Sequence, residues 1–226
     1  MNRLARQGLV VTLTGALALL VLTVAPLSAQ AAVTCTPAET VTGNSNGAIN
    51  VAGDQTLCLD NATQTGAITV DPGGTLSVRR STIDGSVSLN AGYTQFEFCG
   101  SETIGGAIEA TGGTGPVLIG DTGLLGPDRA PVCAANIIDG AVTLDANHGG
   151  VTLARNDIRA AVTATANGNV NVNVKTPTNI VGNDIVGALT CTGNTPAPNN
   201  LGLMGLPEPN VVGGERFGQT CLDGGF

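Results

Sequence analysis

Two carboxylates, Glu109 and Asp145, come nearest to the spacing of a catalytic pair. Glycoside hydrolysis uses two carboxyl groups about 5–9.5 Å apart, one as an acid and the other as a base or nucleophile. If the chain repeats with a period near 20 residues, these two residues lie one strand apart and two residues out of step, which is roughly 8 Å. His148 follows three residues after Asp145. One hypothesis is therefore a polysaccharide-degrading enzyme using Glu109 and Asp145, and the alternative is two solvated acids on a surface strand.

Other catalytic arrangements are missing from the sequence. Asp139 and Asp145 bracket a single strand and lie about 20 Å apart, too far for a hydrolytic pair. Asp71 shares a repeat position with Asp145 but lies three repeats away, so no tight acidic calcium cluster is expected. The sequence has one histidine and no Cys-x-x-Cys or P-loop pattern. These absences favour a non-catalytic protein without a metal or cofactor.

A column of small polar residues is the most regular candidate for a binding face. It occupies the outward position three residues after each repeat glycine and includes Thr69, Ser88, Thr143, Thr163 and Thr190, interrupted by Asn50 and Glu109. A flat face of hydroxyl groups at strand spacing suits either an extended glycan or an ordered layer of water, as on an ice-binding surface. The alternative is that Thr and Ser simply suit outward strand positions.

These residues must be positioned by an internal repeat. A glycine or alanine followed by a small residue and two alternating aliphatic positions recurs at Gly47, Gly66, Gly85, Gly106, Gly140, Ala160 and Gly187. A second alternating strand follows ten or eleven residues after the glycine, and an aliphatic residue stands two residues before it, as at Ile83 and Ile158. A period near 20 with strand-like alternation predicts stacked strands that share one interior.

The repeat predicts an all-β fold, a single-stranded right-handed parallel β-helix (β-solenoid) of about eight coils. A β-sandwich would need antiparallel hairpins, and would not keep these positions in register. Asn136, Asn156, Asn183 and Asn210 occupy one turn position, which predicts stacked, hydrogen-bonded asparagines. Arg159 stands one repeat after Asp139 at the same position, which predicts a surface salt bridge.

Six cysteines predict three disulfides. Cys99 and Cys133 each stand seven residues before a repeat glycine, so adjacent coils would place their Cα atoms about 4.8 Å apart, within disulfide range. By elimination, Cys35 pairs with Cys58 and Cys191 with Cys221.

The N-terminal residues predict export. Arg3 and Arg6, an apolar run from Leu9 to Leu27, and Ala29-Gln30-Ala31 match a secretory signal peptide over residues 1–31, the alternative being a membrane anchor. Residues 32–226 then form one β-helix domain, with a flank loop at 120–135 and an irregular C-terminal cap from about 192. Cleavage removes two of the nine basic residues and none of the seventeen acidic ones, so the net charge becomes 7 − 17 = −10. Such an acidic protein is not expected to bind nucleic acid.

The glycine-led coils, the Asn column and the closing Cys191-Thr-Gly-Asn-Thr-Pro and Gly218-Gln-Thr-Cys221 segments resemble uncharacterised secreted right-handed parallel β-helix proteins of actinobacteria. The coil pattern is also similar to that of bactofilins, polymer-forming cytoskeletal proteins, although those are cytoplasmic and lack disulfides. The resemblance covers the whole mature chain and implies fold and export rather than activity.

The expected function is that of a non-catalytic structural or binding protein of the cell surface or extracellular space, which binds glycans or mediates adhesion. Its expected partner is a polysaccharide or a cell-wall component, and no membrane span is expected after cleavage of the signal peptide. The sequence predicts neither the ligand nor the oligomeric state.

Overall fold

A computed structural model of the chain describes residues 33–100, 103–121, 133–168, 177–201, 207–219 and 221. The chain separates into two compact units, Met1–Gln30 and Ala31–Phe226, and all described residues belong to the second. The expected signal peptide (1–31) and most of the expected flank loop (120–135) lie outside the described residues. In the residues that are described, the second unit is an all-β repeat whose paired strands run parallel, which confirms the all-β prediction.

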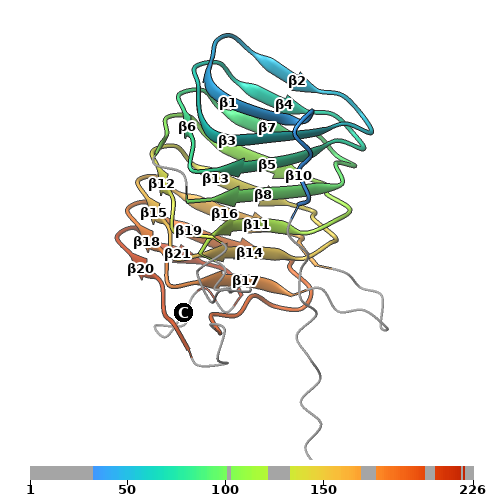
Figure 1. The fold of residues 1–226 in the computed structure, drawn as a ribbon. Helices are drawn as coiled ribbons and strands as arrows, with labels where there is room; N and C mark the ends of the chain where they lie inside the picture. The colour runs from blue at the N-terminus through green and yellow to red at the C-terminus, as the bar shows by residue number, and fades with distance from the viewer. Residues whose placement is uncertain are drawn as a thin grey trace, which may run out of the picture. The chain divides into compact units, whose positions relative to one another are not determined.

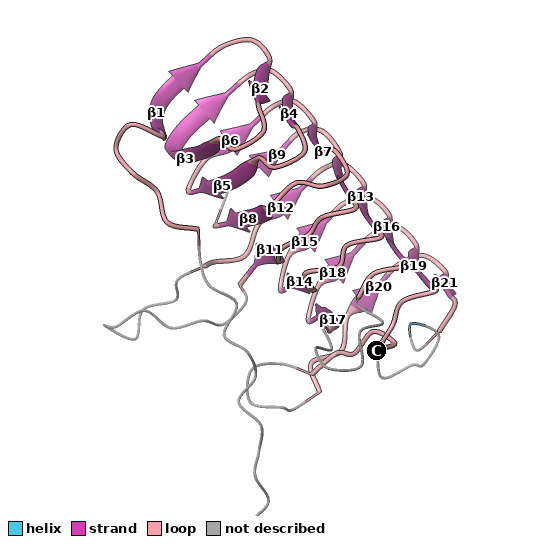
Figure 2. Ribbon diagram, turned by 90° about the vertical axis from the view of Figure 1, so that its right-hand side faces the viewer, coloured by secondary structure: helices cyan, strands magenta, loops and turns pink. Residues whose placement is uncertain are grey.

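One sheet takes a single strand from each repeat. We call it the third strand row, because in each repeat its strand follows the strands of the two other rows described below. Its strands are arranged in chain order (Figure 2) and comprise β2 (Ile49–Val51), β4 (Ile68–Val70), β7 (Val87–Leu89), β10 (Ile108–Thr111), β13 (Val142–Asp145), β16 (Val162–Thr165), β19 (Leu189–Thr192) and β21 (Arg216–Phe217). Each strand begins just after a repeat glycine or alanine, as the sequence predicts.

The other sheet consists of two rows that meet at the long strand β3 (Thr56–Gln64). The first half of β3 begins the first strand row, which continues with β5 (Thr75–Arg79), β8 (Gln95–Cys99), β11 (Val117–Gly120), β14 (Val151–Ala154) and β17 (Thr178–Val181). The second half begins the second strand row, which continues with β6 (Thr82–Ile83), β9 (Thr103–Ile104), β12 (Ile137–Ile138), β15 (Asp157–Ile158), β18 (Asp184–Ile185) and β20 (Val211–Val212). A further strand, β1 (Thr40–Ser45), pairs with β3. Figure 1 shows the strands of each row following one another along the stack.

The three rows pack their apolar side chains into one hydrophobic cluster. Alternate strand residues are fully buried, as in β4, where Ile68 and Val70 are buried and Thr69 between them is half-buried. Tyr93, Phe96 and Phe98 are the largest fully buried side chains, and they join the aliphatic residues in one cluster. Because no single strand could bury its apolar side alone, the stacking of successive repeats supplies the core.

The repeat glycines are required by close packing between turns. A Cβ atom at Gly85 would lie against the backbone of Gly66, and one at Gly106 against the backbone of Gly85 and Ser86. Backbone atoms cannot move aside as a flexible side chain can, so a side chain at Gly85 or Gly106 would displace the neighbouring turn. Ala160 occupies the same repeat position, so the requirement for glycine does not hold at every corner. This contact brings equivalent residues of successive repeats into register.

Candidate functional site

The predicted binding column lies on the outer side of the third strand row. Backbone pairing places each member opposite the next, and the side chains alternate with the buried aliphatic residues. All of them are half-buried or exposed. The structure thus brings the predicted residues into one column, together with Asn50 and Glu109. In order along the stack, the column is Asn50, Thr69, Ser88, Glu109, Thr143, Thr163 and Thr190.

A second outward column runs two residues further along the same strands. Its members are Asp71, Asn90, Thr111, Asp145, Thr165 and Thr192. Asn50 Nδ2 donates a hydrogen bond to Asp71 Oδ2 at 2.9 Å, which connects the two columns. Within the second column, Asn90 Nδ2 donates to Asp71 Oδ1 at 3.3 Å. Only the acids of this column, Asp71 and Asp145, were candidates from the sequence. The face is therefore two columns wide, and threonine occupies both columns on β16 and β19.

Glu109 and Asp145 lie one strand apart, because Glu109 pairs with Thr143 and Asp145 pairs with Thr111. The offset of two residues corresponds to a separation of about 8 Å between the two positions. Glu109 and His148 are exposed and Asp145 is half-buried. These surroundings favour a surface role for both acids.

The expected asparagine ladder is present at the turn before the second strand row. Asn136 Nδ2 donates to Asn156 Oδ1, Asn156 Nδ2 to Asn183 Oδ1, and Asn183 Nδ2 to Asn210 Oδ1, each at 2.9 Å. Each amide also donates to a backbone carbonyl, as Asn156 does to Ile119. All four side chains are buried, so the ladder satisfies buried polar groups along the stack.

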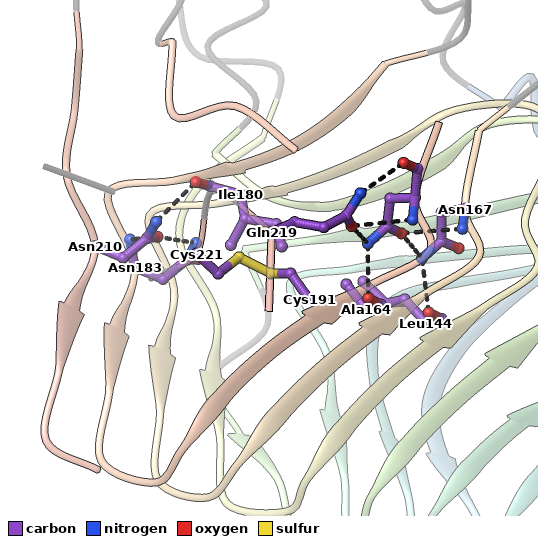
Figure 3. The surroundings of a disulfide bond; sticks show 10 residues. Leu144, Ala164, Asn167, Ile180, Asn183, Cys191, Asn210, Gln219 and Cys221 are labelled. Carbon is purple, nitrogen blue, oxygen red and sulfur yellow. Dashed lines mark hydrogen bonds between the residues drawn. A yellow bond between two sulfur atoms is a disulfide. The ribbon is translucent and has the colours of Figure 1, made fainter. Parts of the chain in front are cut away.

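A second ladder, which the sequence analysis missed, follows the third strand row. Asn147 Nδ2 donates to Asn167 Oδ1 at 2.9 Å, Asn167 Nδ2 to Asn194 Oδ1 at 3.0 Å, and Asn194 Nδ2 to Gln219 Oε1 at 2.9 Å. Figure 3 shows the ends of both ladders on either side of the Cys191–Cys221 disulfide. The signal was readable, since the three asparagines each stand seven residues after a repeat glycine or alanine.

Tyr93 ends this second ladder from two repeats away. Its hydroxyl donates to Asn147 Oδ1 at 2.7 Å, and the backbone N–H of Gly113 donates to the same oxygen at 2.9 Å. A Cβ atom at Gly113 would overlap the Tyr93 ring, so glycine leaves room for the ring to pass. Burial raises the pKa of Tyr93, because the phenolate would lose its hydration.

Three disulfides join the same cysteines that the sequence pairs. They link Cys35 to Cys58, Cys99 to Cys133 and Cys191 to Cys221, with Cα atoms 6.1, 4.7 and 5.8 Å apart. The side chains of Glu97, Cys99 and Cys133 are close enough together to hold a metal ion. Two of these three groups are disulfide sulfurs, which do not offer the thiolate that zinc needs.

Ion pairs connect neighbouring repeats at the surface. Arg159 contacts Asp139 at 2.8 Å, which confirms the predicted pair. Arg155 donates two hydrogen bonds to the Glu208 carboxylate, at 2.9 and 2.8 Å, and also lies 3.5 Å from Asp121. The hydrogen bonds to Glu208 raise the pKa of Arg155. Arg155 thereby links Asp121, at the start of the expected flank loop, to Glu208, which precedes β20. These contacts do not recur with the repeat, so the sequence pattern could not predict them.

Comparison with protein-family models, with curated proteins and with solved structures finds no match to this chain. Among the described residues, none forms a helix of the length and apolar character needed to cross a membrane.

Proposed function

We propose that this is an exported, non-catalytic binding or structural protein of the cell surface or extracellular space, and that the third strand row is its binding face. The observation that carries the proposal is the double column of outward hydroxyl, amide and carboxylate groups, which runs in register from Asn50 to Thr190 in one column and from Asp71 to Thr192 in the other and is half-buried or exposed. The first strand row offers a shorter polar face, because Ser77, Glu97 and Leu118 on its outer side are buried, whereas Thr152 and Asn179 are half-buried.

The ligand class that suits this face is an extended polysaccharide or another cell-wall polymer. Hydroxyl groups both donate and accept hydrogen bonds, so repeated Thr and Ser side chains match repeated sugar hydroxyls. Phe217 pairs with Thr190 at the end of the first column and is 46% exposed. An exposed aromatic ring beside polar groups offers an apolar surface to a sugar ring. Individually weak contacts repeated along one polymer add to a useful affinity.

The rigid support for this face is proposed to be a right-handed parallel β-helix of about eight coils. Eight strands form the third row, one for each proposed coil. Right-handed winding is supported by the strong general preference for right-handed connections between parallel strands of one sheet.

An extracellular location is proposed from two independent features. Residues 1–31 have the pattern of a signal peptide. The six cysteines form three disulfides, which persist in oxidising compartments.

A co-sedimentation assay with a panel of insoluble plant and bacterial polysaccharides tests the proposal. Thr163→Arg places a long side chain in the centre of the proposed face and is expected to reduce binding at least tenfold. Thr82→Arg, an outward threonine on the second strand row, is the matched control and should bind as the wild type does. Equal binding by both variants would refute the location of the face. No binding across the panel would leave only a structural role.

The spacing of Glu109 and Asp145 keeps an enzyme as the second candidate. Incubation of the exported protein with the same polysaccharides measures sugar release. Release that disappears in Glu109→Gln would replace the non-catalytic proposal with a hydrolase.

A water-ordering or ice-binding face is the third candidate, favoured by the threonine pairs Thr163–Thr165 and Thr190–Thr192 on neighbouring strands. A thermal-hysteresis measurement decides it, since an inactive purified protein excludes ice binding.

A further inference from the structure

One outward column of the first strand row is buried although it faces away from the hydrophobic cluster. Its members on β5 and β8 are Ser77 and Glu97, which pair with each other and alternate along their strands with core residues. Both side chains are nevertheless only 1% exposed. Backbone pairing aligns Ser77 with Cys58 on β3. Another part of the chain must therefore cover this column.

The covering part is the segment of residues 33–35, which we call the N-terminal strap. The Cys35–Cys58 disulfide ties the strap to β3. Two residues upstream, the backbone N–H of Val33 donates a hydrogen bond to Glu97 Oε2 on β8 at 2.8 Å, and Val33 is buried. Because these attachments lie on β3 and β8, the strap crosses β5 and Ser77 between them. In Figure 1 the blue N-terminal trace passes over these strands.

The strap ends at a turn that does not depend on the disulfide. Glu39 Oε2 accepts hydrogen bonds from the backbone N–H of Thr36 at 3.0 Å and from its hydroxyl at 2.6 Å. The backbone oxygen of Thr36 accepts from the N–H of Glu39 at 3.1 Å. β1 follows directly and pairs with β3. A movement of the strap can therefore end at Thr36 without disturbing β1.

The surface under the strap is polar and incompletely paired. Arg79 Nη2 lies 2.6 Å from Glu97 Oε1, but Ser77 Oγ and Arg79 Nε are buried and have no hydrogen-bond partner within the described part of the chain. A buried polar group without a partner destabilises the state that buries it, and water satisfies such a group once it is uncovered. Of the strap residues, Val33 is buried while Thr34 and Cys35 are exposed. The covalent bond to Cys58 therefore holds the strap in place more firmly than its contacts do.

The disulfide of the strap is also the most accessible of the three. Cys35 is exposed, whereas its partner Cys58 and the four cysteines of the two other disulfides are buried. Thiol–disulfide exchange requires that an attacking thiolate reach a sulfur atom. Attack at Cys35 is open to a reagent in solution, while the two other disulfides are shielded.

We propose that the Cys35–Cys58 disulfide is a reducible latch, which an external dithiol opens so that the strap leaves Ser77 and Glu97. One thiolate of the dithiol attacks the Cys35 sulfur, which forms a mixed disulfide and releases Cys58 as a thiolate. The second thiol attacks the mixed disulfide, releases Cys35 and leaves the dithiol oxidised to its own disulfide. The two protons of the dithiol pass to the two cysteines, which gain the two electrons that the dithiol loses.

Opening the latch uncovers more of a polar column. Backbone pairing places Ser77 and Glu97 in the same outward column as Thr152 and Asn179, which are half-buried in the closed protein, with Leu118 between the two pairs. The redox state of the latch thus sets how much of the first strand row is open to solvent. This regulation is independent of what the third strand row binds.

Selective reduction tests the latch in the native full-length protein. The protein is treated briefly with dithiothreitol, new thiols are blocked with iodoacetamide, and each labelled cysteine is identified by peptide mass. Cys35 and Cys58 should be labelled at least about tenfold faster than the four other cysteines, because access limits the exchange. Equal labelling of all six cysteines would overturn the proposal.

Carboxyl labelling tests whether the strap moves. Alkylation after reduction keeps the latch open, and a carbodiimide then couples a small amine to accessible carboxylates. Labelling of Glu97 should rise at least about tenfold when the latch is open, since its side chain passes from a buried to a hydrated state. Glu109, an exposed acid, is the internal control and should be labelled equally in both states. Unchanged labelling of Glu97 would show that contacts hold the strap and would reject the latch.

Discussion

We expect the second asparagine ladder to contribute strongly to the free energy of unfolding, and Asn167→Ala tests this. Asn167 is 1% exposed and its side chain takes part in hydrogen bonds on both sides. Its Nδ2 donates to Leu144 O at 2.7 Å and to Asn194 Oδ1 at 3.0 Å. Its Oδ1 accepts from the backbone N–H and from Nδ2 of Asn147, at 3.1 and 2.9 Å. Asn167→Ala removes all of these bonds and leaves the buried N–H of Asn147 without this acceptor.

The expected loss follows from these contacts. A typical buried hydrogen bond contributes about 1 kcal/mol net, and a buried donor left without a partner costs about 1–3 kcal/mol. The free energy of unfolding should therefore fall by about 3–5 kcal/mol. For a domain of this size, such a loss lowers the melting temperature by roughly 6–20 °C. A total stability of about 5–15 kcal/mol makes this a large fraction of the whole.

Equilibrium urea unfolding of the exported protein measures the effect. Thr165→Ala is the matched control, since Thr165 lies two residues earlier and its outward side chain is half-buried. The control should change the free energy of unfolding by no more than about 0.5 kcal/mol. If Asn167→Ala costs less than about 1 kcal/mol, water or a relaxed turn replaces the lost bonds, and the ladder does not stabilise the stack.

Further predictions concern the same interior. Burial raises the pKa of Tyr93, so its stabilising contribution is complete below its unfolded pKa of about 10 and declines above it. As the only tyrosine in a chain without tryptophan, it should show no phenolate absorbance until the protein unfolds, and titration near pH 10 in the native state would contradict its burial. Gly113→Ala should cost about 1–3 kcal/mol in urea unfolding, because its Cβ meets the Tyr93 ring, and a neutral result would mean that the ring moves aside. Replacing Cys99 and Cys133 together by Ala should cost about 2–4 kcal/mol, and an unchanged unfolding midpoint would show that this link is dispensable. Ala166 has a φ of 52°, so Ala166→Gly should stabilise the protein by up to about 1 kcal/mol, whereas destabilisation would show that chain entropy outweighs the strain.

The features that could be predicted from the sequence are those that recur with the repeat. The Cys99–Cys133 disulfide, the outward column through Thr143 and Thr163, and the ladder through Asn156 each occupy one repeat position. Parallel stacking in register converts a shared repeat position into spatial neighbours. A periodic signal is therefore enough to identify such contacts, and the missed ladder through Asn167 carried the same kind of signal.

By itself the sequence determined the stacked strands, their register and the composition of the third strand row, because each is set by local alternation and repetition. Only the tertiary structure decided that Glu97 is buried, that Tyr93 reaches Asn147 past Gly113, and that Arg155 contacts Glu208. These contacts join residues that do not share a repeat position. The burial of Glu97 depends on the N-terminal segment, the Tyr93 contact depends on the absence of a side chain at Gly113, and the Arg155 contact depends on the irregular segment before β20. Their energy depends on which surfaces the folded chain brings together, and periodicity carries no information about that.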